Sequence, residues 1–247
     1  LNMDFNERTP FYLISVIFLF ITIILSLITT FSINKNGNDF FPLGGVYKNI
    51  NIIDDSFVDK LCWYFSQLTH HTLFLLFSYF FMALLNIKSV KFFKMIGPLA
   101  LTISVMYFYF LYPKQKLKIH QLSFYNFFSH FMIIFLVFCE FMYIDTYEFH
   151  ETTNCFIFII SSILCIYINY FLRGVWSYDM IHLNSFKGWK LVSETTLIMY
   201  VFSLMFYILK YKNHDYYGLN DICFKDCFYV LSGLTNIIFV LIFTNYN

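Results

Sequence analysis

Seven long apolar stretches determine what this chain of 247 residues can fold into. They cover residues 11–33, 63–85, 92–112, 124–144, 155–172, 191–209 and 227–244. A helix rises 1.5 Å per residue, so about 20 apolar residues cross the roughly 30 Å hydrocarbon core of a bilayer. Only helices and closed barrels satisfy every backbone group in lipid. The sequence therefore predicts an all-α, polytopic transmembrane helix bundle with about seven spanning helices, and we expect the first stretch to be a retained anchor because no A-x-A cleavage site follows it.

The composition fits a protein whose partner is membrane lipid. Hydrophobic residues make up 59% of the chain and charged residues 13%, compared with about 25% charged residues in soluble domains. The net charge of +1 predicts no nucleic-acid partner. Lysine and arginine are shared almost evenly between alternate loops, so the positive-inside rule leaves the orientation undecided. No repeat, linker or low-complexity tail marks a second domain, and we expect one transmembrane domain over residues 1–247.

A few polar residues lie inside the apolar stretches, where they are costly and usually functional. They are Thr69, His70, His71, Asn126, His130, Glu140 and Glu194. Asn126 and His130 are four residues apart and share one helix face. We expect His130 to face the bundle interior. A neutral imidazole there could act as a general base, a proton relay or a ligand, or simply bond to a neighbouring helix.

The polar start of the second stretch offers a partner for His130. A threonine hydroxyl such as that of Thr69 becomes a nucleophile only when a base takes its proton. His130 could be that base if the two helix faces meet. The alternative is that threonine hydroxyls bond back to helix carbonyls and the histidines are interfacial. Glu140 lies roughly 15 Å from His130 along the helix, and we expect it to reach the interface or to pair with Arg173 or a lysine.

The histidines and cysteines predict neither a metal site nor a cofactor. Only three of the seven histidines fall at membrane depth, and the chain lacks the H-x-x-H-H boxes of di-iron membrane desaturases. Cys223 and Cys227 are four residues apart, not in a C-x-x-C pair, and in a helix this spacing suits neither a zinc knuckle nor an unstrained disulfide.

An ordered set of short motifs covers residues from about 44 to 210. The motifs are Gly44-Gly45-Val46-Tyr47-Lys48, Tyr112-Pro113-Lys114, the spacing of Asn126, His130 and Glu140, the run Gly174-Val175-Trp176-Ser177-Tyr178, and Thr195-Thr196. The set resembles the androgen-induced and androgen-dependent TFPI-regulating family of polytopic membrane hydrolases. The chain departs from that family at Phe127, where a histidine is frequent, at Asp179, where a proline is usual, and in its seventh apolar stretch.

The resemblance implies a threonine hydrolase that cleaves fatty-acid esters of hydroxy fatty acids in the endoplasmic reticulum. The catalytic histidine corresponds to His130. Counting from the Gly-Gly pair puts Asn51 at the position of the threonine, whereas matching the aromatic-x-x-Leu-Thr run puts Thr69 there. We prefer Thr69, because it opens a spanning helix.

In this reading, Thr69 and His130 are catalytic, and four other residues contribute to substrate binding. These four are Asn126, Ser129, His71 and Trp176. The alternative is a non-catalytic integral subunit of a membrane complex, such as a mitochondrially encoded respiratory-chain subunit of the inner membrane, with partner subunits on its extra span. The high usage of Phe, Tyr, Ile and Asn favours this alternative.

Overall fold

A computed structural model of the chain describes residues 5–32, 56–87, 89–111, 127–144, 147–178 and 181–216. All regular structure in these ranges is helical, which confirms the predicted all-α fold. Four helices are long and apolar enough to cross a membrane: Arg8–Ser32, Val90–Tyr109, Phe149–Arg173 and Phe186–Lys210. Two shorter apolar helices cover Leu68–Leu84 and Phe128–Met142. The predicted span at 227–244 lies outside the described residues, so the number of about seven spans stays a prediction.

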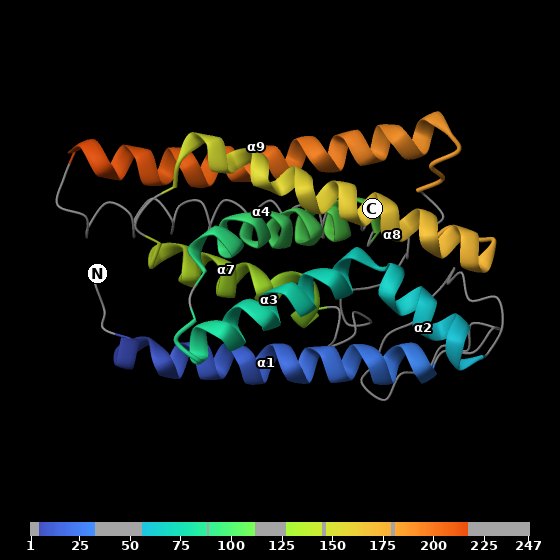
Figure 1. Ribbon diagram of the computed structural model, residues 1–247, viewed down its shortest axis with the longest axis horizontal. Helices are drawn as coiled ribbons and strands as arrows, with labels where there is room; N and C mark the ends of the chain where they lie inside the picture. The colour runs from blue at the N-terminus through green and yellow to red at the C-terminus, as the bar shows by residue number, and fades with distance from the viewer. Residues whose placement is uncertain are drawn as a thin grey trace, which may run out of the picture.

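The helices form a bundle around α4 (Figure 1). Its main elements are α1 (Phe5–Ser32), α2 (Phe57–Ser66), α3 (Leu68–Leu84), α4 (Val90–Met106), α7 (Ile133–Met142), α8 (Cys155–Arg173) and α9 (Phe186–Tyr216). In Figure 1, α1 and α3 lie below α4 and α7, and α8 and α9 lie above them. Helix α4 contacts α3, α7, α8 and α9. It is the central helix. Of the residues in its most apolar part, 72% are buried, compared with 24–33% in the other three long helices.

A loop between α7 and α8 completes the hydrogen bonding of α4. Pro98 has no N–H, so the carbonyl of Lys94 one turn earlier loses its normal helical donor. The hydroxyl of Tyr147 donates to that carbonyl at 3.0 Å instead. The ammonium of Lys94 pairs with the carboxylate of Glu151, and both side chains are nearly inaccessible, at 5% and 6% exposure. Tyr147 and the 3₁₀ helix η4 (Phe149–Asn154), which carries Glu151, thereby hold α4 near its proline.

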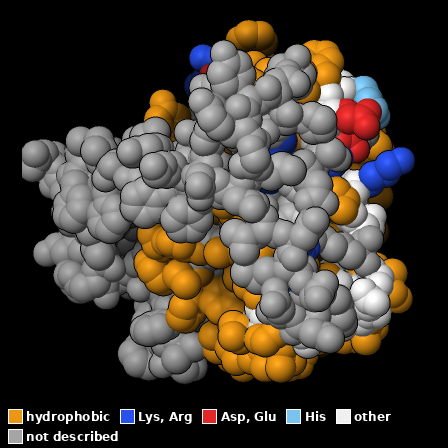
Figure 2. All heavy atoms as spheres, turned by 90° about the vertical axis from the view of Figure 1, so that its left-hand side faces the viewer, with side chains coloured by type: hydrophobic (Ala, Val, Ile, Leu, Met, Phe, Trp, Pro, Cys, Tyr) orange, Lys and Arg blue, Asp and Glu red, His pale blue; other side chains and the backbone are white. Residues whose placement is uncertain are grey.

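The outer faces of the long helices are apolar and exposed, as lipid contact requires. On α1 and α8 they carry Ile14, Ile17, Phe20, Ile157, Ile160, Leu164 and Phe171. Figure 2 views the bundle from the end where α1 begins. Most of the described side chains there are hydrophobic, and a small group of charged and histidine side chains lies at one side. These helices are compatible with an integral membrane protein.

The predicted span over residues 63–85 is two helices. Helix α2 ends at Ser66 and α3 begins at Leu68, because Gln67 between them has extended backbone, with φ −87° and ψ 123°. The 17 residues of α3 measure about 25 Å. Consequently Thr69 lies in the first turn of α3.

Candidate site around His130 and the first turn of α3

His130 and Tyr107 stack on each other from two π-helical segments. Their ring centroids are 3.7 Å apart and their planes differ by 4°. His130 belongs to η3 (Phe128–Met132) and Tyr107 begins η1 (Tyr107–Leu111). π-Helices account for well under 1% of residues and occur frequently at functional sites. Two of them meeting at a buried histidine mark this place as the candidate site.

The imidazole of His130 is buried inside the bundle, as the sequence predicts, with 3% of the residue exposed. Its Nδ1 atom has no hydrogen-bond partner among the residues that the structure describes. Leaving a buried polar nitrogen unsatisfied costs about 1–3 kcal/mol. Native proteins keep few such atoms, and a catalytic role is one of the reasons for keeping them.

Helix α3 lies next to this histidine. It contacts η3, and His70 in its first turn is buried, as His130 is. Thr69 precedes His70 and is half-buried. The structure therefore brings together the two helices that carry the predicted catalytic pair, with no hydrogen bond from Thr69 to Nδ1 of His130.

His70 and His71 donate to the carbonyls of Tyr64 and Phe65 at the end of α2, where the break at Gln67 removes the usual helical donors one turn later; the carbonyl of Tyr64 also accepts the N–H of Gln67 at 3.3 Å. Nδ1 of His70 donates to the carbonyl of Tyr64 at 2.7 Å, and the two rings stack with centroids 3.8 Å apart. Nε2 of His71 donates to the carbonyl of Phe65. These tautomers are assigned from the bonds, since a carbonyl only accepts. His71, predicted to bind substrate, thus uses one nitrogen on the backbone. His70, which the sequence singles out as a polar residue of this stretch without a role in the site, is buried here beside it.

The turn between α8 and α9 caps the N-terminal end of α3, on the other side of the break. The first free N–H of α3, on Leu68, donates to the hydroxyl of Tyr178 at 2.8 Å. The side-chain amide of Gln67 donates to the carbonyl of Ser177 at 3.1 Å. Burial raises the pKa of the Tyr178 phenol, so its oxygen remains a neutral acceptor at physiological pH. The Gly-x-Trp-x-Tyr motif is therefore a helix cap.

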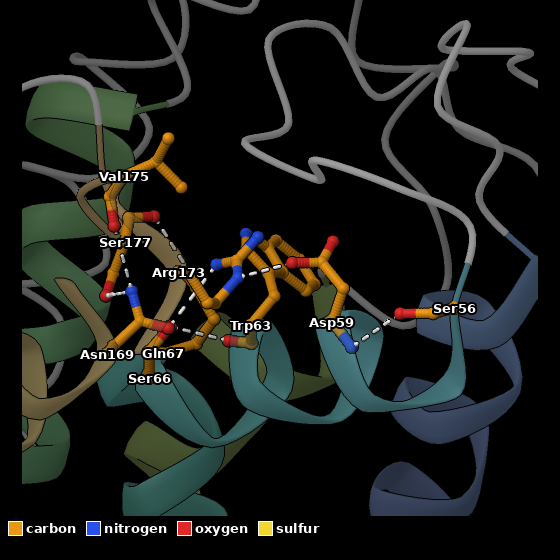
Figure 3. A network of polar contacts seen from close by, with 9 residues as sticks. All are labelled: Ser56, Asp59, Trp63, Ser66, Gln67, Asn169, Arg173, Val175 and Ser177. Carbon is orange, nitrogen blue, oxygen red and sulfur yellow. Dashed lines mark hydrogen bonds and ion pairs between the residues drawn. The ribbon is translucent and has the colours of Figure 1, made fainter. Parts of the chain in front are cut away.

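Buried polar contacts hold this turn in place (Figure 3). Nε of Arg173 donates to Oδ1 of Asp59 at 2.6 Å, with both side chains at most 7% exposed. The amide of Asn169 donates to Oγ of Ser177 at 3.0 Å and to the carbonyl of Val175 at 3.3 Å. We call residues 173–178 the clasp. Arg173 of the clasp binds Asp59 of α2, and Tyr178 of the clasp accepts the N–H of Leu68, the first residue of α3.

The remaining predicted substrate-binding residues lie in different places. Ser129 is fully buried beside His130 in η3. Trp176 stacks on Tyr170 with centroids 4.2 Å apart and packs in a separate apolar cluster. Asn126 lies outside the described residues.

Glu140 differs from its expected role. It is completely buried in α7 and accepts a hydrogen bond from the hydroxyl of Tyr79 at 2.5 Å. It does not reach the interface, and Arg173 pairs with Asp59 instead. The position of Glu140 near the end of its apolar stretch predicts an acid at the interface. Its tyrosine partner lies 61 residues away, so the local sequence does not reveal the pairing. Within the described ranges, no group of three or more His, Cys, Asp or Glu side chains could hold a metal ion.

Comparison of the chain with protein-family models, with curated proteins and with solved structures gives no match. The family resemblance therefore rests on the sequence motifs alone.

Proposed function

We propose that the protein is an intramembrane hydrolase of lipid esters, such as fatty-acid esters of hydroxy fatty acids, with Thr69 as nucleophile and His130 as base. The observation that supports this function most is the buried Nδ1 of His130, which lacks a hydrogen bond within the described part of the chain. The contact of its π-helix with α3 adds to it. A base at bilayer depth suits a substrate whose ester lies within an acyl chain. On the family resemblance, we propose the endoplasmic reticulum as its location.

The reaction would proceed through an acyl-enzyme. The hydroxyl oxygen of Thr69 attacks the ester carbonyl while His130 takes the hydroxyl proton. His130 then gives this proton to the departing alkoxide, and the C–O bond of the ester breaks. Water, activated by the same imidazole, removes the acyl group from Thr69 as a free acid. Ser129 and Asn126 are the proposed donors to the developing oxyanion. Hydrogen bonds between nucleophile and base are often long or poorly aligned before substrate binds.

The test uses the full chain purified in detergent, an active-site-directed fluorophosphonate and a hydrolysis assay. We expect the probe to label Thr69. Thr69→Ala and His130→Ala should each reduce ester hydrolysis by at least about 100-fold. A matched control is Thr72→Ala, because the buried hydroxyl of Thr72 only bonds back to the carbonyl of Leu68 at 2.9 Å. His150→Ala is a second control, since His150 is exposed.

Two results would contradict the hydrolase. One is full activity in Thr69→Ala or His130→Ala with normal folding, and the other is labelling at a different residue. The complex-subunit interpretation would then be the better one, and copurification of partner subunits from the native membrane would examine it.

A further inference from the structure

A helix break inside an apolar stretch requires partners for every backbone group that it frees. Near lipid, an unsatisfied N–H or C=O costs several kcal/mol, and irregular backbone is tolerated only where protein satisfies it. At Gln67 these partners come from two directions. His70 and His71 of α3 donate to carbonyls of α2. The clasp accepts hydrogen bonds from the N–H of Leu68 and from the side-chain amide of Gln67.

The clasp contacts both helices through residues that are close together in sequence. Arg173 binds Asp59 in the first turn of α2, and five residues later Tyr178 binds the first residue of α3. Gly174 makes this tight path feasible, because its φ of +72° is a conformation that side chains disfavour. The N–H of Gly174 also donates to the carbonyl of Tyr170 at 2.7 Å, which anchors the clasp on the last turn of α8.

We propose that the clasp is a positioning element of the site: it fixes the break between α2 and α3 and so holds Thr69 and His70 beside the π-helix of His130. Thr69 directly follows Leu68, whose N–H the clasp binds. Any shift of that bond therefore moves the proposed nucleophile. The kinetic consequence rests on the proposed hydrolase, whereas the effect on α3 does not.

Tyr178→Phe tests the proposal, because it removes one oxygen and keeps the ring. Two quantities are measured on the full chain in nanodiscs: amide hydrogen exchange over residues 64–72, and kcat and KM for ester hydrolysis. We expect exchange at Leu68 to rise at least about tenfold. We expect kcat to fall at least about tenfold, since misplacing a reacting group by about 1 Å can cost 100-fold, with KM unchanged within about twofold.

Tyr147→Phe is the matched control. It also deletes a tyrosine hydroxyl that bonds to the backbone, here from the buried Tyr147 to the carbonyl of Lys94 at 3.0 Å. It should leave exchange at Leu68 and kcat unchanged. A charge exchange adds a rescue test. Arg173→Asp alone should raise exchange at Leu68, and the double variant Asp59→Arg/Arg173→Asp should restore it in part.

The outcomes separate the two proposals. Unchanged exchange at Leu68 in Tyr178→Phe overturns the positioning role, and so does an equal loss of kcat in Tyr147→Phe. Raised exchange with an unchanged kcat in an active enzyme also overturns it. If the wild-type chain hydrolyses no lipid ester but exchange responds as expected, the proposed function fails and the clasp remains the element that places α3.

Discussion

Removing the ammonium from the buried Lys94–Glu151 pair should destabilise the bundle more than any change to a surface charge. Lys94→Met keeps the length of the side chain and deletes its charge, which leaves the carboxylate of Glu151 buried without a cation. Breaking a buried pair in this way typically costs about 3–5 kcal/mol. The N–H of Glu148 still donates to Glu151 at 2.8 Å, so we expect the lower end, about 3 kcal/mol. The double variant Lys94→Met/Glu151→Gln removes both charges and should cost less than either single change.

Reversible unfolding in mixed detergent and SDS micelles, followed by circular dichroism, measures these free energies. Lys190→Met provides the control, because Lys190 and Glu194 form an exposed pair at 3.8 Å with side chains 64% and 42% exposed. Exposed pairs contribute about 0–1 kcal/mol. If Lys94→Met costs no more than this control, the pair is not buried as described. If the double variant costs the sum of the two single variants, the two charges do not interact.

Two further changes test the packing of the bundle by the same unfolding measurement. Tyr79→Phe removes one hydrogen bond to the buried carboxylate of Glu140 and should cost about 1–3 kcal/mol; a neutral result would show that this hydrogen bond does not stabilise the bundle. Gly188→Ala would place a Cβ 2.1 Å from the carbonyl oxygen of His182 and should cost about 3 kcal/mol, whereas Gly174→Ala meets nothing within 4 Å and should cost only about 1 kcal/mol for its positive φ. Equal effects of the two glycine changes would contradict the close approach at Gly188.

The positions of the apolar helices could be predicted because lipid imposes one simple requirement on composition. The stretch at 155–172 matches α8, which covers Cys155–Arg173. The stretch at 191–209 lies inside α9, which extends from Phe186 to Tyr216. An apolar stretch ends where charged residues begin. The helix itself continues through them, because its backbone hydrogen bonds do not depend on apolar side chains.

The break at Gln67 and the interior pairings could not be predicted, because their partners are remote in sequence. Gln67 bonds to Ser177, which is 110 residues away, and no local pattern reveals that distance. The local signal is the polar run around Gln67, which is equally typical of the polar start of a continuous spanning helix. The burial of His130 could be predicted from its cost in lipid. Its stacking on Tyr107 could not, since it depends on two π-helical segments.

The break and the clasp are far apart in sequence, so they are synthesised at different times. Residues 57–84 leave the ribosome long before residues 173–178 exist. Until then the hydroxyl of Tyr178 is not there to accept the N–H of Leu68, and an unsatisfied amide in the bilayer is disfavoured. A nascent chain that ends before residue 173 should therefore hold one continuous helix from Phe57 to Leu84. We therefore expect the bend at Gln67, and with it the placement of Thr69, to form only after residues 173–178 have been made.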